Sequence, residues 1–440
     1  MFKSPTTFSD ISKLFTGIAL AGALSACAAT QSSPSIVQPV LETEAELMDR
    51  ARGIHQQSLV LDAHADIVLP STSKTYLAKD GLSKVDPAKL KAGNVGAVVM
   101  SVAVPPGPRT PAGDAQARME AEQKLAAVSK LAAENTALEI ATSAAQVTVL
   151  RSSGKTALIL GFQNARSLEG NVTHLDVFYK AGVRVFGLNH MGHNDFSDSS
   201  RPLFLSGTGK YEVTEEHGGL SSLGRAAIRR INELGGIVDV SQMSKAATLQ
   251  AINLSKAPVI ASHSNVRNLS NVSRNLSDDE IDLIAKTDGV IHLAAFGAYL
   301  VDLSDPDLLA TIRKVRREAG LPEAYSYPYE LYWEISDLSK RQSFLIAMRD
   351  VIGPGSVDRL TDHIDYIVGR VGIDHVGIGS DFNHGGGVAA FVDASEALNL
   401  TVALVKRGYS ANQIKKIWGG NFLRVFQEVQ RISISNRKAP

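Results

Sequence analysis

Eight short apolar runs, each of four to eight residues, recur along this 440-residue chain and limit the folds open to it. They are rich in Val, Ile and Leu and occupy residues 59–63, 95–102, 157–162, 183–188, 237–240, 258–261, 289–294 and 375–379. Nearly continuous apolar runs, rather than runs that alternate with polar residues, indicate strands covered on both faces, as in parallel sheets. The pattern therefore predicts an α/β protein.

The segments between these runs have helical patterns. Residues 114–133 and 223–234 keep apolar residues at helical spacing, and Ser277 followed by three acids is typical of a helix start. Eight such units predict a TIM-type (β/α)8 barrel with long insertions after the fourth and seventh strands, at residues 194–222 and 303–350. No Gly-x-Gly-x-x-Gly motif follows the first run, which disfavours a dinucleotide-binding sheet.

The second insertion holds a cluster of aromatic residues, namely Tyr325, Tyr327, Tyr329, Tyr332 and Trp333. Segments that follow strand carboxyl ends overhang the mouth of a barrel and often form walls of its pocket. We expect the cluster to line one side of a substrate pocket. Packing between insertion helices, or across a subunit contact, is the alternative.

The first 27 residues have the pattern of a signal peptide. Lys3 and Lys13 precede the apolar stretch 14–23, which is too short to span a membrane. The stretch runs into Leu-Ser-Ala-Cys27, which resembles the lipobox of bacterial lipoproteins, whose cysteine becomes lipidated. Because Ala28 follows in place of Asp, we expect an anchor in the outer membrane that faces the periplasm. An ordinary secretory signal is the alternative.

Beyond this signal we expect three parts: a tether at 28–45, a barrel domain at 46–430 and a tail at 431–440. Cys27 is the only cysteine, so a mature domain has no disulfide and no thiolate metal site. Any metal must then be held by His, Asp or Glu. The net charge is zero and no basic stripe is present, which gives no support for nucleic-acid binding.

Polar side chains follow the apolar runs where a barrel carries its catalytic residues. Catalytic groups of TIM barrels lie at the carboxyl ends of the strands. The residues at those ends include His64, Asp66, Gln163, His190, Gln242, His263 and Asp381. His64 and Asp66 are two residues apart on a strand and so point to the same face, where one metal ion can contact both. His384, in a glycine-rich segment after Asp381, is a weaker candidate for a substrate contact.

The order of these motifs resembles the renal (membrane) dipeptidase family of zinc hydrolases, within the amidohydrolase barrels. The resemblance covers Ser58 to Phe426, nearly all of the mature chain. The motifs that carry it are Asp62-Ala-His-Ala-Asp66, Lys89-Leu-Lys-Ala-Gly-Asn-Val-Gly96, Gly187-Leu-Asn-His190, Ala257-Pro-Val-Ile-Ala-Ser-His263, Arg274, Gly377-Ile-Gly-Ser-Asp381 and Gly420-Asn-Phe-Leu-Arg-Val-Phe426.

The resemblance implies a two-zinc site that hydrolyses dipeptides. Residue by residue, His64 and Asp66 match ligands of the first metal, and His263 matches one ligand of the second. Asp381 matches the acid/base carboxylate, and His190 matches a histidine that contacts the substrate and the developing oxyanion.

The resemblance also implies the partners of the chain. Arg274 matches the cation that holds the substrate's free carboxylate, which predicts a dipeptide or a small carboxylate-bearing amide as substrate. Family members often pair through the barrel flank, so a homodimer is compatible with this resemblance.

Two positions depart from the family pattern, and both lie in the metal shell. Gln163 stands where the family has a metal-bridging Glu, and Gln242 stands where it has the second histidine of the second metal. Amide oxygens are weak zinc ligands, and two divalent ions about 3.5–4 Å apart need a bridging anion to relieve their repulsion. We therefore favour one zinc on His64 and Asp66, helped by Gln163, Asp381 or water, while two zincs or no metal remain alternatives.

These departures leave three functions open. The first is metal-dependent hydrolysis of dipeptides. The second is a dipeptidase fold that has lost turnover and serves as a binding or accessory protein, which the two glutamines favour. The third is hydrolysis of another small amide or of a lactone.

Overall fold

The computed structural model describes residues 42–205, 208, 210–323, 335 and 337–438. The predicted signal peptide with Cys27, most of the predicted tether and the aromatic cluster of the second insertion lie outside these residues. Among the described helices, none is both long enough and apolar enough to cross a membrane.

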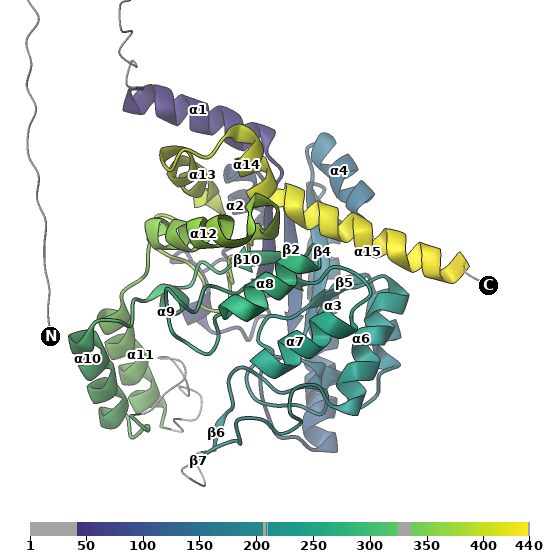
Figure 1. Ribbon diagram of the computed structural model, residues 1–440, viewed down its shortest axis with the longest axis vertical. Coiled ribbons are helices and arrows are strands. Elements are labelled where there is room, and N and C mark those ends of the chain that lie inside the picture. Colours follow the sequence, from purple (N-terminus) through teal and green to yellow (C-terminus); the bar gives the residue numbers. More distant parts are fainter. Residues whose placement is uncertain (1–41, 206–207, 209, 324–334, 336, 439–440) are drawn as a thin grey trace, which may run out of the picture. The chain divides into compact units, whose positions relative to one another are not determined.

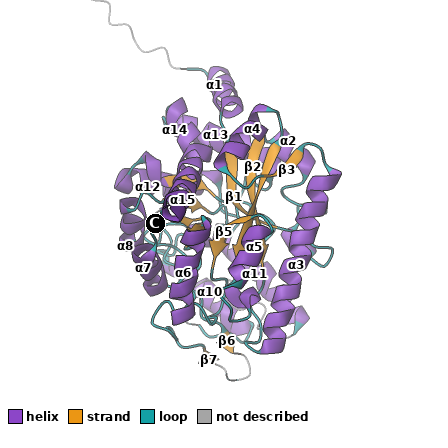
Figure 2. Ribbon diagram, turned by 90° about the vertical axis from the view of Figure 1, so that its right-hand side faces the viewer, coloured by secondary structure: helices purple, strands orange, loops and turns teal. Residues whose placement is uncertain are grey.

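A parallel barrel forms the centre of the unit that spans residues 43–440, and helices surround it (Figures 1 and 2). Its eight strands follow the order β1-β2-β4-β5-β8-β9-β10-β11, and β3 (Leu138–Ile140) pairs with β4 outside this path. The bounds are β1 Val60–Asp66, β2 Val95–Ala103, β4 Thr156–Gln163, β5 Val183–Gly187, β8 Ile237–Asp239, β9 Ile260–Ala261, β10 Val290–Leu293 and β11 Val376–Ile378. Each coincides with one of the eight predicted runs, which confirms the (β/α)8 prediction.

Hydrogen bonds between the first strand and the segment after the last strand close the sheet into a barrel. The amide of Asp66 donates to the carbonyl of Phe382 at 2.9 Å, and the amide of Asp381 donates to the carbonyl of His64 at 3.0 Å. The carboxylate of Asp62, within β1, accepts from the amide of Ser380 at 2.7 Å and from its hydroxyl. The seam of the barrel is thus made from the two segments that carry the predicted catalytic carboxylates.

The helices of the barrel layer lie between the strands in sequence. They are α1 Glu44–Gln57, α2 Pro87–Ala92, α3 Pro111–Glu134, α4 Ala144–Ser152, α5 His174–Lys180, α6 Ser222–Leu234, α7 Lys245–Leu254, α8 Asp278–Lys286, α9 Gly297–Leu300, α12 Val357–Val371, α13 Ala397–Lys406, α14 Ala411–Lys415 and α15 Asn421–Lys438. Polar residues fix their starts: Ser277 and Glu280 form a reciprocal capping box at α8, as Thr43 and Glu46 do at α1. The predicted tail at 431–440 begins inside α15, because this amphipathic helix continues to Lys438.

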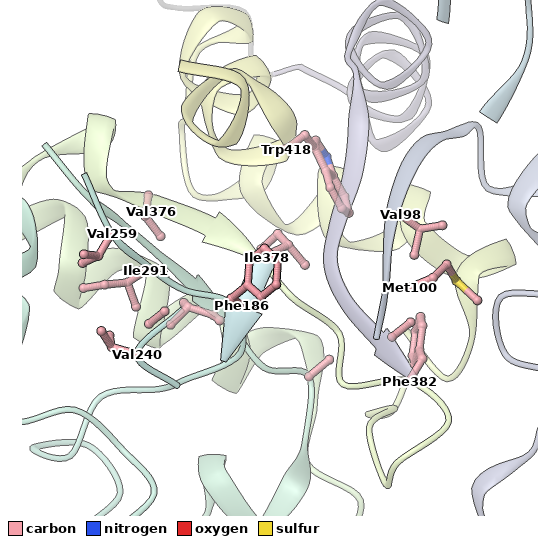
Figure 3. Packing of buried hydrophobic residues seen from close by; sticks show 14 of the residues in the cluster. Val98, Met100, Phe186, Val240, Val259, Ile291, Val376, Ile378, Phe382 and Trp418 are labelled. Atoms are coloured by element: carbon pink, nitrogen blue, oxygen red, sulfur yellow. The ribbon is translucent and has the colours of Figure 1, made fainter. Parts of the chain in front are cut away.

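Two sets of apolar residues stabilise the barrel. One lies inside it, where Leu61, Val99 and Ile159 from successive strands meet Phe422 of α15. The other lies between sheet and helices and includes Phe186, Ile378 and Trp418, part of which Figure 3 shows. Strands buried on both faces explain the nearly continuous apolar runs of the sequence.

The two predicted insertions follow β5 and β10. The first forms the short hairpin β6 (Phe204–Leu205) and β7 (Lys210–Tyr211), and the second forms α10 (Pro306–Glu318) and α11 (Leu338–Ile352). Both lie below the sheet in Figures 1 and 2, the end at which the strand carboxyl ends place the site. Helices α10 and α11 have their own apolar cluster, which includes Ile312, Phe344 and Met348.

Candidate metal centre and active site

The carboxyl ends of the barrel strands bring most of the predicted site residues together. The rings of His64 and His263, which are 199 positions apart in the chain, stack with their centroids 3.7 Å apart. Gln163 and Gln242 both contact His263, and all of these side chains are buried. These side chains therefore lie together where the strand-end rule predicted them, and their roles stay predictions.

His64 and Asp66 present two potential ligand atoms on one face of β1. Nε2 of His64 and Oδ1 of Asp66 are 3.3 Å apart, and this buried oxygen accepts no hydrogen bond from the described residues. In a tetrahedral zinc shell, ligand atoms about 2.0–2.2 Å from the ion are about 3.3–3.5 Å from each other. The pair thus has the separation that one zinc ion requires.

His384 holds the other oxygen of Asp66. Its Nδ1 lies 2.8 Å from Oδ2 of Asp66, and its ring stacks on Tyr76 at 5.3 Å between centroids. Burial alone would raise the pKa of Asp66, but the charge and hydrogen bond of His384 outweigh it, and the pKa lies well below its usual range. His384 therefore keeps Asp66 ionised and orients it.

Asp239 and Ser262 fix the tautomers of the two stacked histidines. The Ser262 hydroxyl donates to Oδ2 of Asp239 at 2.5 Å, so it accepts from Nδ1 of His263 at 2.8 Å and from Nδ1 of His64 at 3.4 Å. Both rings then present the Nε2 lone pair to the centre, as metal ligands do.

Asp239 itself is a structural partner rather than a ligand. It lies within 4.8 Å of ligand atoms of His64 and His263. However, its Oδ1 accepts from the amides of Ser241 and Ser262, both at 2.9 Å, and its Oδ2 accepts the Ser262 hydroxyl. A carboxylate with these bonds positions the histidines more readily than it binds an ion.

The two glutamine amides face the same atom of His263. Nε2 of Gln163 and Nε2 of Gln242 each lie 3.4 Å from Nε2 of His263. Oε1 of Gln242 is buried without a hydrogen-bond partner among the described residues. Two amide groups thus occupy the position at which His263 would contact a second ion.

Asp381 lies at the seam between β11 and β1 with a strained backbone. Its φ of 60° is in the left-handed region, which non-glycine residues enter mainly at functional sites. Burial raises the pKa of Asp381, while the neighbouring His64 and His384 act in the opposite direction. A buried carboxyl with a raised pKa suits proton transfer near neutral pH.

His190, the residue predicted to contact the oxyanion, has a buried ring next to His384, with 4.9 Å between centroids. Burial, then the positive charge of His384, lowers the pKa of His190 well below its usual range, which keeps the ring neutral. Its Nδ1 has no hydrogen-bond partner among the described residues, so a donor or acceptor position is available there.

Arg274 is close to the centre but is held by the protein. Its Nη1 donates to Oγ of Ser264 at 2.9 Å and its Nη2 donates to the carbonyl of His263 at 2.6 Å. Its guanidinium lies over the ring of Tyr299, and only 2% of the residue is exposed. Contact with a substrate carboxylate stays a prediction for this residue.

A cavity of about 690 Å³ opens beside the centre. Its walls come from the segment after β1, from Arg201 of the first insertion, from the segment after β10 with α9, from α11 and from the loop after Asp381. They include Tyr76, Lys84, Tyr299, Arg349 and His384. Because His384 also binds Asp66, the cavity and the candidate metal centre share a wall.

The geometry at the strand ends agrees with the comparisons to known proteins. The sequence profile of the family described as Membrane dipeptidase (Peptidase family M19) matches residues 48–439. The chain belongs to this family. It is 35% identical to the probable dipeptidase PvdM from Pseudomonas aeruginosa, with a TM-score of 0.78, over 89% of this chain and 100% of that one.

Curated membrane dipeptidase relatives are more distant. The chain is 27% identical over 285 residues to Dipeptidase aclJ of Aspergillus oryzae and 28% identical over 304 residues to Dipeptidase tcpJ of Claviceps purpurea. These matches cover 64% and 68% of this chain, but only 54% and 57% of the two fungal proteins. The chain thus spans little more than half of their length.

The donor set of this membrane dipeptidase family member fits a bound metal ion. His64 and Asp66 offer an imidazole nitrogen and a carboxylate oxygen without a hydrogen-bond partner, which are ligands that zinc prefers. Around His263 lie the neutral amides of Gln163 and Gln242, whereas the nearby carboxylate of Asp239 is held by Ser241 and Ser262.

Sequence reasoning missed three parts of the site. Asp239 is a charged residue inside an apolar run, a signal that could have marked it. His384 was considered only as a substrate contact, because its bond to Asp66 joins residues 318 positions apart. The cationic residues of the cavity come from separate segments and carry no local motif.

Proposed function

We propose that the chain is a metal-dependent dipeptidase that works with one zinc ion at an altered centre. The observation that carries the proposal is the pair of Nε2 of His64 and Oδ1 of Asp66, 3.3 Å apart, buried and aimed at the same point. Family membership supports peptide hydrolysis, and Asp381 and His190 lie around the same point with groups suited to proton transfer and oxyanion contact.

His64 and Asp66 would hold the ion, with Ser262 and His384 orienting them from behind. When bound, zinc supplies Lewis-acid activation of water and of the amide carbonyl. Asp381 then takes a proton on its carboxylate and hands it to the leaving amine nitrogen. His190 stabilises the developing oxyanion from its free Nδ1, a type of contact whose removal costs about 10²–10³ in rate.

Metal analysis and substrate screening test this proposal together. The soluble form that starts after Cys27 is purified without chelator, and its zinc content is measured by mass spectrometry. We expect about one zinc per chain, loss of that zinc in His64→Ala, and cleavage of a dipeptide from a panel. Asp381→Asn should keep the metal but lower kcat by about 10²–10⁴-fold. Two ions per chain would contradict the one-metal centre.

A binding or accessory role is the second candidate, because two amides face His263 where the family has metal ligands. It predicts no zinc even after zinc is supplied, and no turnover of dipeptides, N-acyl amino acids or lactones. If only an N-acyl amino acid or a lactone is cleaved, the proposed metal centre stands and the proposed substrate class is wrong.

We also propose that Cys27 carries a lipid anchor, on the strength of the lipobox-like sequence before it. Mass spectrometry of the membrane-extracted chain should show a diacyl or triacyl modification at Cys27. Cys27→Ser should release the chain from the membrane fraction, and an unmodified wild-type cysteine would contradict the anchor.

A further inference from the structure

The cavity beside the metal centre carries an excess of positive charge. Four cationic residues line it, namely Lys79, Lys84, Arg201 and Arg349, against two carboxylates, Asp80 and Asp393. Both carboxylates already pair with Lys89, whose Nζ lies 2.8 Å from Asp80 and 3.3 Å from Asp393. Lys89 does not line the cavity, and its single positive charge offsets one of their two negative charges from behind the wall.

Lys84 and Arg349 both line the cavity, come from different segments of the chain and influence each other. Lys84 follows β1 in the chain and its Nζ donates to the carbonyl of Gly386, whereas Arg349 lies on α11 of the second insertion. The guanidinium of Arg349 forms no ion pair or hydrogen bond with any residue that the structure describes. Burial, then the charge of Arg349, lowers the pKa of Lys84 to about 8. Two cations that repel each other across a cavity are stabilised by an anion between them.

The rest of the wall is apolar. Leu77, Phe296, Tyr299, Leu345 and Val392 face the same space, which suits the aliphatic part of an amino-acid side chain. No lining carboxylate is free to receive a substrate ammonium, because Asp80 and Asp393 are paired. The cavity therefore suits the carboxyl-terminal residue of a dipeptide rather than its amino-terminal one.

The cation pair is connected to the reacting centre. Lys84 binds Gly386, whose amide donates to the carbonyl of Asp381 at 2.8 Å. His384, in the same loop, lines the cavity and binds Asp66. A group held between Lys84 and Arg349 thus belongs to a molecule whose scissile bond can lie at Asp381.

We propose that Lys84 and Arg349 form a subsite for a side-chain carboxylate, so that the chain selects substrates whose carboxyl-terminal residue is acidic. The substrate preference rests on the proposed dipeptidase function. The binding of a carboxylate by Lys84 and Arg349 does not. The subsite is separate from Arg274, which does not line the cavity.

Isosteric pairs test the subsite directly. Gly-Glu and Gly-Gln differ only in a carboxylate against an amide, and their kcat/KM values are compared in the wild type and in Arg349→Gln. Because a charge-assisted hydrogen bond is strong, we expect the kcat/KM of the wild type to be about tenfold higher for Gly-Glu than for Gly-Gln. The ratio of the two kcat/KM values should fall towards one in Arg349→Gln and stay at its wild-type value in Arg349→Lys.

A matched control comes from the same insertion. Arg313 is an exposed arginine on α10 that does not line the cavity, so Arg313→Gln should leave the preference unchanged. Equal losses in Arg313→Gln and Arg349→Gln would show an effect of net charge and overturn the subsite. Thermal melting of each variant checks that it is folded.

Binding without turnover separates this inference from the proposed function. L-glutamate and L-glutamine, the two leaving amino acids, are titrated into the wild type and Arg349→Gln by calorimetry. If no dipeptide is cleaved but glutamate binds about tenfold more tightly than glutamine in the wild type alone, the subsite stands and the hydrolase proposal fails. If both dipeptides are cleaved equally and both amino acids bind equally, the subsite is wrong and the hydrolase proposal stands.

Discussion

At the scale of single residues, the centre depends on which groups face Nε2 of His64 and Nε2 of His263. The first faces a carboxylate oxygen that lacks a hydrogen bond, and the second faces two amides. Zinc binds carboxylate and imidazole far better than a neutral amide. In the proposed one-ion centre, the limit on the number of ions therefore comes from two side chains, Gln163 and Gln242.

Replacing those two side chains should create a second metal position. In the double variant Gln163→Glu and Gln242→His, a carboxylate can bridge two ions and His263 gains a second imidazole. We expect zinc content to rise from about one to about two per chain by mass spectrometry. Gln56→Glu, an exposed change on α1, adds the same charge elsewhere and should leave the zinc content unchanged. A double variant that still binds one ion would show that these amides do not limit the metal count.

Lys84 gives the subsite a pH dependence. The groups that act on it are Arg349, Asp381, Asp393 and Lys89, and together with burial they place its pKa at about 8 in place of 10.5. The ammonium is present below pH 8 and is lost as the pH rises through 8, so glutamate affinity should fall over that range. Lys84→Arg stays charged, and its affinity should be flat between pH 7 and 9. Identical pH profiles for the wild type and Lys84→Arg would exclude Lys84 from the subsite.

At the scale of elements, the site is positioned by how closely the ends of β9 and β11 approach each other, with β10 between these two strands in the sheet. A Cβ atom at Gly379, directly after β11, would lie 1.8 Å from the carbonyl oxygen of Ser262, directly after β9. This approach sets Asp381 and His263 on the same rim of the barrel. The glycine is needed for space, because its φ lies outside the left-handed region.

Two glycine-to-alanine changes should therefore have opposite effects. Gly379→Ala forces β9 and β11 apart, and we expect a loss of about 3 kcal/mol in the free energy of unfolding together with loss of metal binding. Gly369→Ala lies in the last turn of α12 with nothing within 4 Å, and it should stabilise the chain by about 0.5–1 kcal/mol. Denaturant unfolding measures both, and a neutral Gly379→Ala would mean that the two strand ends can separate without cost.

At the scale of the whole molecule, the barrel and its second insertion build the cavity jointly. Tyr76 and His384 come from the barrel rim, whereas Leu345 and Arg349 come from α11, which packs on α10 through a separate apolar cluster. The barrel rim and the insertion thus both contribute to the charge of the pocket, with Lys79 and Lys84 from the segment after β1 and Arg349 from α11.

A bound ion should also stabilise the folded chain as a whole. The folded state alone places His64 and Asp66 together, so zinc at a hundred times its Kd adds about 2.7 kcal/mol to the free energy of unfolding. We expect the Tm to fall by a few degrees after chelation and to recover with one equivalent of zinc. His64→Ala should have the lower Tm and show no response to zinc. If the Tm of the wild type changes neither on chelation nor on addition of zinc, the centre binds no metal.

Local pattern alone determined much of this protein. Eight apolar runs predicted eight strands, because strands buried on both faces must be apolar along their length. The rule that catalytic groups follow strand carboxyl ends then selects His64, Asp66, His263 and Asp381 from the sequence alone. The family resemblance rested on the same local motifs and proved correct.

Only the tertiary structure decided how those residues are partnered. The bond from His384 to Asp66, the relay from Asp239 through Ser262 to both histidines, and the cavity that Lys84 and Arg349 both line all join segments far apart in the chain. Sequence spacing places a side chain on a face of its own strand, but it does not say which distant side chain lies opposite. Closure of the barrel brings those residues within hydrogen-bond distance, and with them the balance of charge that fixes what the site can bind.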